Sequence, residues 1–173
     1  MLKQKFDLQK AIEVLLYITE KVNNTYNALK VLYFADKSHL SKYGRLICGD
    51  VYIAMEHGPV PSNMYDIVKQ VRGDSFYEFD TEEDIENLFE ISNRYIIKSK
   101  RKANSEYLSE SDIECLDEAI KQYGHLNFSD LRDRSHDDAF RAADYNDVIP
   151  FEEIIRALPN AGELIEYFEI DED

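Results

Sequence analysis

Apolar residues recur at helical spacing in the first quarter of the chain. In residues 7–22 they fall on one face, and Asp7 precedes them as a residue type that caps helix N-termini. Residues 25–43 repeat the pattern, and Gly44 follows at a position where a glycine commonly ends a helix. The sequence therefore predicts two consecutive helices here.

The same spacing predicts further helices downstream. Residues 61–72 and 109–123 each place their apolar side chains on one face, and Ser109 with Asp112 forms a variant of the capping box. Shorter helices are predicted at 129–134, 137–144 and 151–157, with a short acidic one around 81–88.

Two central segments have the pattern of extended structure instead. Residues 51–55 alternate around Tyr52, and residues 89–99 resemble a hairpin or bent strand turning near Ser92. No internal repeat or low-complexity tract is present. We therefore predict an α+β, predominantly α-helical protein, a single compact domain of about six to eight helices with a small central antiparallel sheet or hairpin.

Asp36 lies on the apolar stripe of the second predicted helix, with His39 beside it. A carboxylate that faces a core needs a charged or hydrogen-bonding partner, because burying it unpaired is costly. Among the candidates Lys30, His39, Arg45 and His57, we favour a structural ion pair and assign Asp36, His39 and Arg45 to a structural polar core.

The segment from His57 to residue 61 combines rigidity with exposed carbonyls. Gly58 can adopt backbone angles closed to other residues, and Pro59 and Pro61 remove two backbone donors. Such a segment pairs with a partner at little cost in ordering. The residues alone leave two interpretations open, a stiff turn between strand and helix or a preformed contact edge.

The charge balance restricts the class of partner. With 20 basic and 35 acidic residues, the net charge of −15 disfavours nucleic acid and anionic membranes and favours a basic protein. Cys48 and Cys115 have no nearby cysteine, so two buried thiols in a reducing cytosol are expected. The apolar run at 14–18 is too short to span a bilayer and no signal peptide precedes it, which predicts a cytoplasmic protein.

Sequence motifs for catalysis or cofactor binding are weak. The four histidines and two cysteines form no zinc-binding spacing, and no glycine-rich nucleotide-binding motif is present. We expect no metal, no cofactor and no catalytic residue. A hydrolase or transferase that uses His57 or His136 with Ser38, Ser135 or Cys48 is the enzymatic alternative.

One long stretch, LYFADKSHLSKYGRLICGDVYIAMEHGPVPSNMYDIVK at 32–69, has a distinctive set of residues, and LRDRSHDD adds Leu131, Ser135 and His136. Both resemble the signature of the Panacea domain of SocA-like antitoxins, which also occurs in phage-associated proteins. The matching positions in the first stretch are Tyr33, Phe34, Ala35, Asp36, His39, Leu40, Gly44, Arg45, Gly49, Asp50, Tyr52, Ala54, Gly58, Pro59 and Val60. The chain departs from the family at Ala139 and Phe140, where proline and tryptophan are frequent.

The resemblance implies a non-enzymatic module that neutralises a co-encoded toxin or related effector by direct contact, with delivery to a protease system as a known variation. It favours partner contacts in the signature region, at Tyr43, Tyr52, His57, Gly58, Pro59, Val60 and His136. The predicted division is a Panacea domain at 1–158 and an acidic C-terminal extension at 159–173. The alternative function is an acidic, nucleic-acid-mimicking or phage-encoded inhibitor of a host protein, using the acidic segments 74–90 and 162–173.

Overall fold

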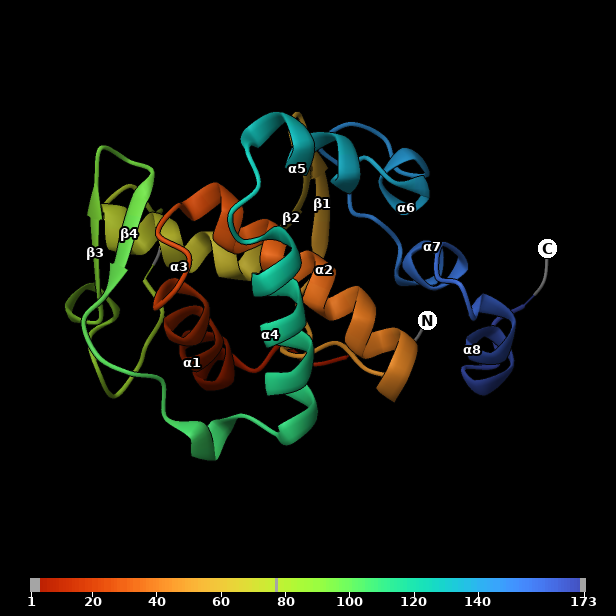
Figure 1. Cartoon of the computed structure of the whole chain (residues 1–173), viewed down its shortest axis with the longest axis horizontal. Helices are drawn as coiled ribbons and strands as arrows, with labels where there is room; N and C mark the ends of the chain where they lie inside the picture. Colours follow the sequence, from red (N-terminus) through yellow and green to blue (C-terminus); the bar gives the residue numbers. More distant parts are fainter. Residues whose placement is uncertain (1–3, 77, 172–173) are drawn as a thin grey trace.

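Helices form most of the regular structure in the computed structural model, which describes residues 4–76 and 78–171 (Figure 1). The helices are α1 (Leu8–Thr19), α2 (Thr25–Tyr43), α3 (Ser62–Arg72), α4 (Glu110–Tyr123), α5 (Phe128–Ser135), α6 (Asp138–Arg141), α7 (Phe151–Arg156) and α8 (Ala161–Tyr167), with short 3-10 turns η1 (Ile85–Asn87) and η2 (Ser105–Tyr107). The strands are β1 (Tyr52–Met55), β2 (Gly58–Pro61), β3 (Phe89–Ser92) and β4 (Ile96–Ser99). The predicted class, α+β and mostly helical, is confirmed.

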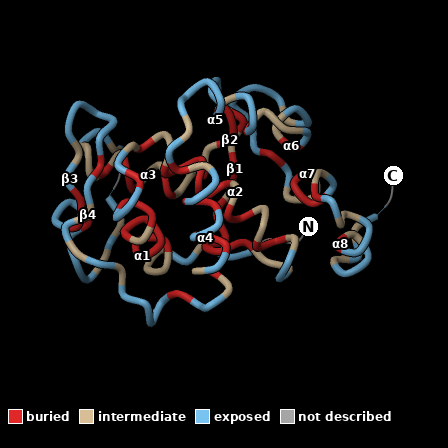
Figure 2. The backbone as a smooth tube through the Cα atoms, viewed as in Figure 1, coloured by how far each residue is buried: buried red, intermediate tan, exposed pale blue. Residues whose placement is uncertain are grey.

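Helix α2 runs through the middle of the molecule and is buried along most of its length (Figure 2). One apolar core joins its residues Val31 and Leu32 to α1, α3 and α4. A second core joins Tyr33 and Leu40 of the same helix to β1 and to the helices α6–α8. Because α2 supplies side chains to both cores, it fixes the two halves of the fold relative to each other.

The predicted helix ends are confirmed by their capping contacts. The Asp7 side chain accepts a hydrogen bond from the backbone N–H of Lys10, and Ser109 and Asp112 form the full reciprocal capping box of α4. Gly44 ends α2 with φ of 73°, in the left-handed region that glycine adopts without strain. These signals involve residues three or four apart, which is why the sequence reveals them.

The strands form two separate antiparallel hairpins. Tyr52 is paired with Pro61 in the β1–β2 hairpin, and Phe89 with Ser99 in the β3–β4 hairpin. Residues 58–61, which we considered as a stiff turn, are therefore a strand. The other edge of β1 bonds to the segment around Val148, so β2 with its two prolines is the edge strand, where missing backbone donors are tolerated.

Some predicted elements are shorter than expected. The acidic helix at 81–88 is reduced to η1, and the helix at 137–144 to the four residues of α6. The acidic segment 74–90 is joined to the basic residues that follow β4, since Arg101 makes an ion pair of 2.8 Å with Glu83. Arg101 also pairs at 2.8 Å with the buried Glu13 of α1.

The acidic C-terminal segment contains a helix that the sequence analysis did not predict. Helix α8 buries Leu164 and packs with α7 at the opposite end of the molecule from the β3–β4 hairpin (Figure 1). The side chains of Ser41 and Asn160 join this end to α2 through a hydrogen bond of 2.7 Å. Tyr167 lies against Gly44.

Both cysteines are free and buried, as predicted. Over the described residues, no helix combines the length and the apolar character needed to cross a membrane.

Candidate partner-binding site

Asp36 is buried and accepts hydrogen bonds from two neutral donors. The backbone N–H of Ile47 donates to Oδ1 at 2.7 Å, and the hydroxyl of Tyr52 donates to Oδ2 at 2.6 Å. The prediction of a cationic partner is wrong. β1 places the Tyr52 hydroxyl against the carboxylate, and among the described residues none of the four candidate cations pairs with it. Burial raises the pKa of Asp36 to about 7, although both hydrogen bonds oppose that shift.

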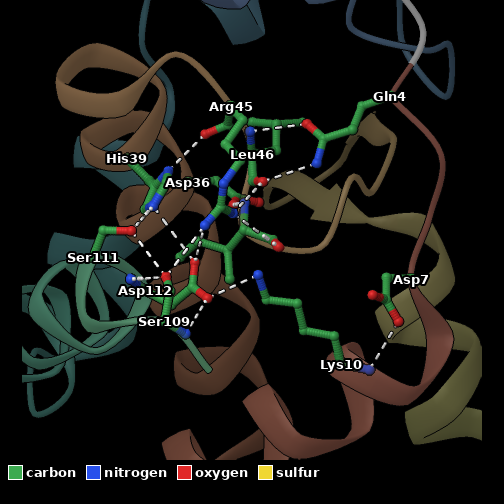
Figure 3. A network of polar contacts seen from close by, with 11 residues as sticks. Gln4, Asp7, Lys10, Asp36, His39, Arg45, Leu46, Ser109, Ser111 and Asp112 are labelled. Carbon is green, nitrogen blue, oxygen red and sulfur yellow. Dashed lines mark hydrogen bonds and ion pairs between the residues drawn. The ribbon is translucent and has the colours of Figure 1, made fainter. Parts of the chain in front are cut away.

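His39 and Arg45 belong to a neighbouring polar network that is centred on Asp112 of α4 (Figure 3). Asp112 is fully buried and pairs with Arg45 at 2.9 Å and with Lys10 at 2.8 Å. His39 bonds to the carbonyl of Arg45 and to the hydroxyl of Ser111, both at 2.9 Å. Burial alone would raise the pKa of Asp112, but its contacts with Lys10 and Ser109 lower it. This network joins α1, α2 and α4.

Asp50 stabilises the start of α3, where the N-cap residue is a proline without a capping side chain. Its carboxylate accepts hydrogen bonds from the backbone N–H groups of Asn63 at 3.0 Å and Met64 at 2.9 Å. A carboxylate there satisfies backbone donors that the helix itself leaves free and faces the positive end of its dipole. The signature residue Asp50 is thus a cap supplied from outside the helix.

The two parts of the signature meet where the β1–β2 hairpin touches α2 and α5. The buried Lys30 Nζ donates a hydrogen bond of 2.8 Å to the carbonyl of Pro59. Gly58 has φ of 116°, and a Cβ atom there would lie 2.6 Å from the hydroxyl oxygen of Ser135. Only glycine therefore allows the hairpin to pack this closely on α5.

Asp137 joins the connection between α5 and α6 to α2. Its Oδ2 atom accepts hydrogen bonds from the Tyr33 hydroxyl and from Lys37 Nζ, both at 2.7 Å. His136 stacks on Phe140 with ring centroids 4.2 Å apart, so the phenylalanine that departs from the family pattern covers the histidine of the signature. Burial is the main cause that lowers the pKa of His136.

Two adjoining hollows open beside this junction. The first, which we call the Lys30 cavity, has a volume of about 300 Å³ and is lined by Lys30, Val60 and Tyr145, among others. The second, the Phe128 hollow, has a volume of about 550 Å³. They share the lining residues Tyr26, His57 and Tyr95.

Exposed aromatic rings surround these hollows. Phe128 is 48% exposed, Tyr95 60% and Tyr145 70%. Phe128 packs against the rings of Tyr26 at 4.8 Å and His57 at 5.1 Å between centroids. We call these five side chains the aromatic surface. Exposed aromatic groups gathered at a concave site are typical of interaction surfaces.

The predicted contact residues divide into three groups. Tyr52, Gly58 and Pro59 are buried and shape the hairpin, so these residues are not available to a partner in this structure. His57 is exposed, and Val60 and His136 are partly buried near it. Tyr43 is exposed at the other end of α2, about 25 Å along the helix from Tyr26, and donates a hydrogen bond to Glu114.

Sequence reasoning missed several residues of this site. Lys30 was considered only as a partner of Asp36, and Tyr26, Tyr95 and Phe128 were not singled out. The four-residue spacing of Tyr26 and Lys30 places them on one helix face, which was the available signal. Tyr95 and Phe128 come from distant segments, and their proximity has no local signal.

The described residues contain no group of three or more His, Cys, Asp or Glu side chains arranged to hold a metal ion. Both ring nitrogens of the buried His39 are engaged in hydrogen bonds.

A comparison with protein-family models matches residues 29–140 to the description "Antitoxin SocA-like, Panacea domain". Comparisons with curated proteins and with solved structures gave no match. The matched range covers well over half of the chain and includes both parts of the signature, the β1–β2 hairpin and Leu131, Ser135 and His136 of the α5 region. The chain belongs to the Panacea family of SocA-like antitoxin domains.

Proposed function

We propose that this protein neutralises a toxic protein or a related effector by binding it directly through the aromatic surface. Family membership supports an antitoxin-like, non-catalytic role and a protein partner such as a toxin. The observation that carries the finer proposal is the position of the aromatic surface, which lies where the hairpin of the signature meets α2 and α5.

His57 is the centre of the proposed contact. It is 49% exposed, lines both hollows and lies at the turn between β1 and β2. Its backbone carbonyl accepts a hydrogen bond of 2.8 Å from the Tyr26 hydroxyl, which holds the turn in place. Val60 and His136 extend this contact, whereas Tyr52, Gly58 and Pro59 act through the shape of the hairpin. A surface that is already rigid before binding loses little conformational entropy when the partner binds.

The net charge of −15 favours a basic partner, because opposite charge steers association. Tyr43 is too far from the hollows to belong to the same small contact, so we propose it as a separate contact for a partner that extends over the surface to the C-terminal end of α2. We also propose a protease system, to which the bound toxin is delivered, as a second partner, and the cytoplasm is the compartment in which we expect both.

The alternative, a nucleic-acid mimic, needs the two acidic segments to form one continuous surface. The segment 74–90 leads into the β3–β4 hairpin, while α8 lies at the opposite end of the molecule (Figure 1). Part of the first segment is also neutralised internally, since Glu83 pairs with Arg101 and Asp74 with Arg94. Direct binding through the aromatic surface is therefore the better supported function.

The test is rescue of growth by co-expression with the product of a neighbouring reading frame that is toxic alone. We expect the wild type to restore growth and the double variant Tyr95→Ser/Phe128→Ser to lose rescue and co-purification. The control is Phe76→Ser/Tyr107→Ser, two exposed aromatic residues that line neither hollow. Rescue by the first double variant at the wild-type level would refute the proposed surface.

A further inference from the structure

The Phe128 hollow has no permanently charged side chain in its lining, although 32% of the residues in the chain are charged. Among the described residues, the lining combines aromatic rings and His57 with three asparagines and contains no Lys, Arg, Asp or Glu. A phosphate or a charged side chain would therefore find no permanent counter-charge there. The hollow is suited to a neutral ligand.

Two of the asparagines are helix caps whose side-chain oxygens are already used. The Oδ1 atom of Asn24 accepts a hydrogen bond of 3.2 Å from the backbone N–H of Asn27, at the start of α2. The Oδ1 atom of Asn127 accepts one of 2.8 Å from the backbone N–H of Asp130, at the start of α5. In the described part of the chain, neither side-chain NH2 group has a hydrogen-bond partner. Each cap thus holds its amide in place and leaves an NH2 group free to donate.

The third asparagine of the lining is bonded in the opposite sense. The Nδ2 atom of Asn27 donates to the carbonyls of Gly124 and Leu126, both at 3.0 Å, which leaves its side-chain oxygen as an acceptor. The three asparagines together offer two free NH2 groups against one free oxygen. A ligand that matches them brings more hydrogen-bond acceptors than donors.

The aromatic rings supply the apolar part of the lining. Phe128 is held between Tyr26 and His57, and nearly half of its own surface remains exposed, as does more than half of that of Tyr95. A volume of about 550 Å³ accommodates a few residues of an extended chain but no folded element. The hollow is therefore complementary to a short, neutral, apolar segment that is rich in acceptors.

We propose that the Phe128 hollow binds a proline-containing segment of the partner polypeptide in the extended polyproline II conformation. A proline residue has a carbonyl acceptor, no N–H donor and an uncharged apolar ring. Consecutive prolines therefore bring both properties that the lining matches, and aromatic-lined grooves are a recurring way to bind such segments. The carbonyls accept hydrogen bonds from Asn24 and Asn127, and the rings pack on Phe128 and Tyr95.

Other neutral ligands match the lining less well. An ordinary apolar peptide brings one N–H for every carbonyl, and a sugar hydroxyl donates as well as accepts. Either ligand needs acceptors, but the helix caps already use the side-chain oxygens of Asn24 and Asn127. A proline segment also loses little conformational entropy on binding, because its backbone is already restricted. The net charge of −15 then attracts basic residues that flank the segment.

This proposal rests on the proposed function for the nature of the partner, but its test needs no toxin. The purified full chain is titrated with acetyl-Gly-Pro-Pro-Pro-Pro-Gly-amide, with the same peptide in which alanine replaces every proline, and with cellotriose. Binding is followed by NMR. We expect the proline peptide to bind at least about fivefold more tightly than either of the others, with the largest shifts in the side-chain NH2 signals of Asn24 and Asn127.

The double variant Asn24→Asp/Asn127→Asp tests the role of the two NH2 groups. Aspartate is an equally good N-cap, so both helices keep their caps while the free donors are replaced by acceptors. The preference for the proline peptide over the alanine peptide should disappear. Asn104→Asp, the same change at the N-cap of η2, lies outside both hollows and should keep the preference. If the double variant does not fold by circular dichroism, Phe128→Leu is the second variant and should weaken binding of the proline peptide at least about fivefold.

Four results would each overturn the proposal: no binding of the proline peptide, equal binding of the proline and alanine peptides, tighter binding of cellotriose, or an unchanged preference in the folded double variant. Failed rescue of a toxin, with the proline preference intact, would overturn the proposed function alone. Rescue that depends on Tyr95 and Phe128, without any proline preference, would overturn this proposal alone.

Discussion

The hydroxyl of Tyr52 and the carboxylate of Asp36 form a buried hydrogen bond of 2.6 Å between β1 and α2. Both are signature residues, and neither side chain is open to solvent. At these two positions the family signature therefore specifies the contact that attaches the β1–β2 hairpin to the central helix α2. The hairpin in turn presents His57 at the aromatic surface.

The first prediction concerns the pH dependence of stability. Burial raises the pKa of Asp36 from 3.8 to about 7, so the folded protein holds this proton more tightly than the unfolded chain does. Between pH about 4 and about 7 the unfolded chain is already ionised, and raising the pH there lowers the free energy of unfolding. Asp36→Asn cannot ionise and should lack this loss, which amounts to a few kcal/mol at about 1.4 kcal/mol per pKa unit.

Urea denaturation of both proteins across this pH range measures the effect. The difference in unfolding free energy, wild type minus variant, should fall steadily through the window and stay level above it. A difference independent of pH would show that Asp36 is already ionised in the folded protein throughout.

The second prediction separates backbone strain from steric overlap at glycine. Gly58 and Gly73 both have positive φ, 116° and 80°, but a Cβ atom would meet Ser135 only at Gly58, because nothing lies within 4 Å of it at Gly73. Gly73→Ala should cost about 1 kcal/mol from the backbone alone. Gly58→Ala should cost roughly 2–4 kcal/mol, since the hairpin must also move away from α5.

Thermal and urea unfolding of the two alanine variants provide the comparison. Because the Gly58 variant displaces the turn that holds His57, we also expect it to lose partner binding, while Gly73→Ala keeps it. Similar losses of stability in both variants would contradict the close packing of Gly58 on Ser135.

The third prediction tests the buried network around Asp112. Asp112→Ala leaves Lys10 and Arg45 without their shared carboxylate, and breaking one side of a buried ion pair typically costs about 3–5 kcal/mol. Glu118→Ala is the control, because its ion pair with Lys42 is solvent-exposed and should contribute little. Chemical denaturation distinguishes the two. Equal, small effects would mean that α1, α2 and α4 are held together without the network.

The fourth prediction tests whether the acidic C-terminal segment is part of the folded unit. Leu164 is buried against the α7 region, so Leu164→Ala should lower the free energy of unfolding by about 2–3 kcal/mol. Glu166→Ala, on the exposed side of the same helix, should have almost no effect. The boundary at residue 158 separates a true extension only if the Leu164 variant is as stable as the wild type.

Local interactions account for what could be predicted from the sequence. The α2 boundaries follow from its apolar spacing and from Gly44, and the start of α4 from Ser109 with Asp112. Each signal acts within one turn of helix, so no knowledge of the rest of the chain is needed. The acidic charge and the family signature are also properties of the sequence alone.

Long-range packing decided the rest. Asp36 meets Tyr52, Lys30 meets Pro59, and Gly58 meets Ser135 only because β1 and β2 fold back on α2 and because α5 closes over them. In sequence, Asp36 has several equally plausible cations nearby, and nothing marks Lys30 as a buried ammonium without a carboxylate. The sequence by itself determined most of the helices, the caps of α1, α2 and α4, and the family. The tertiary structure decided which polar groups are buried together and which aromatic rings share a surface, since both depend on residues that are distant along the chain.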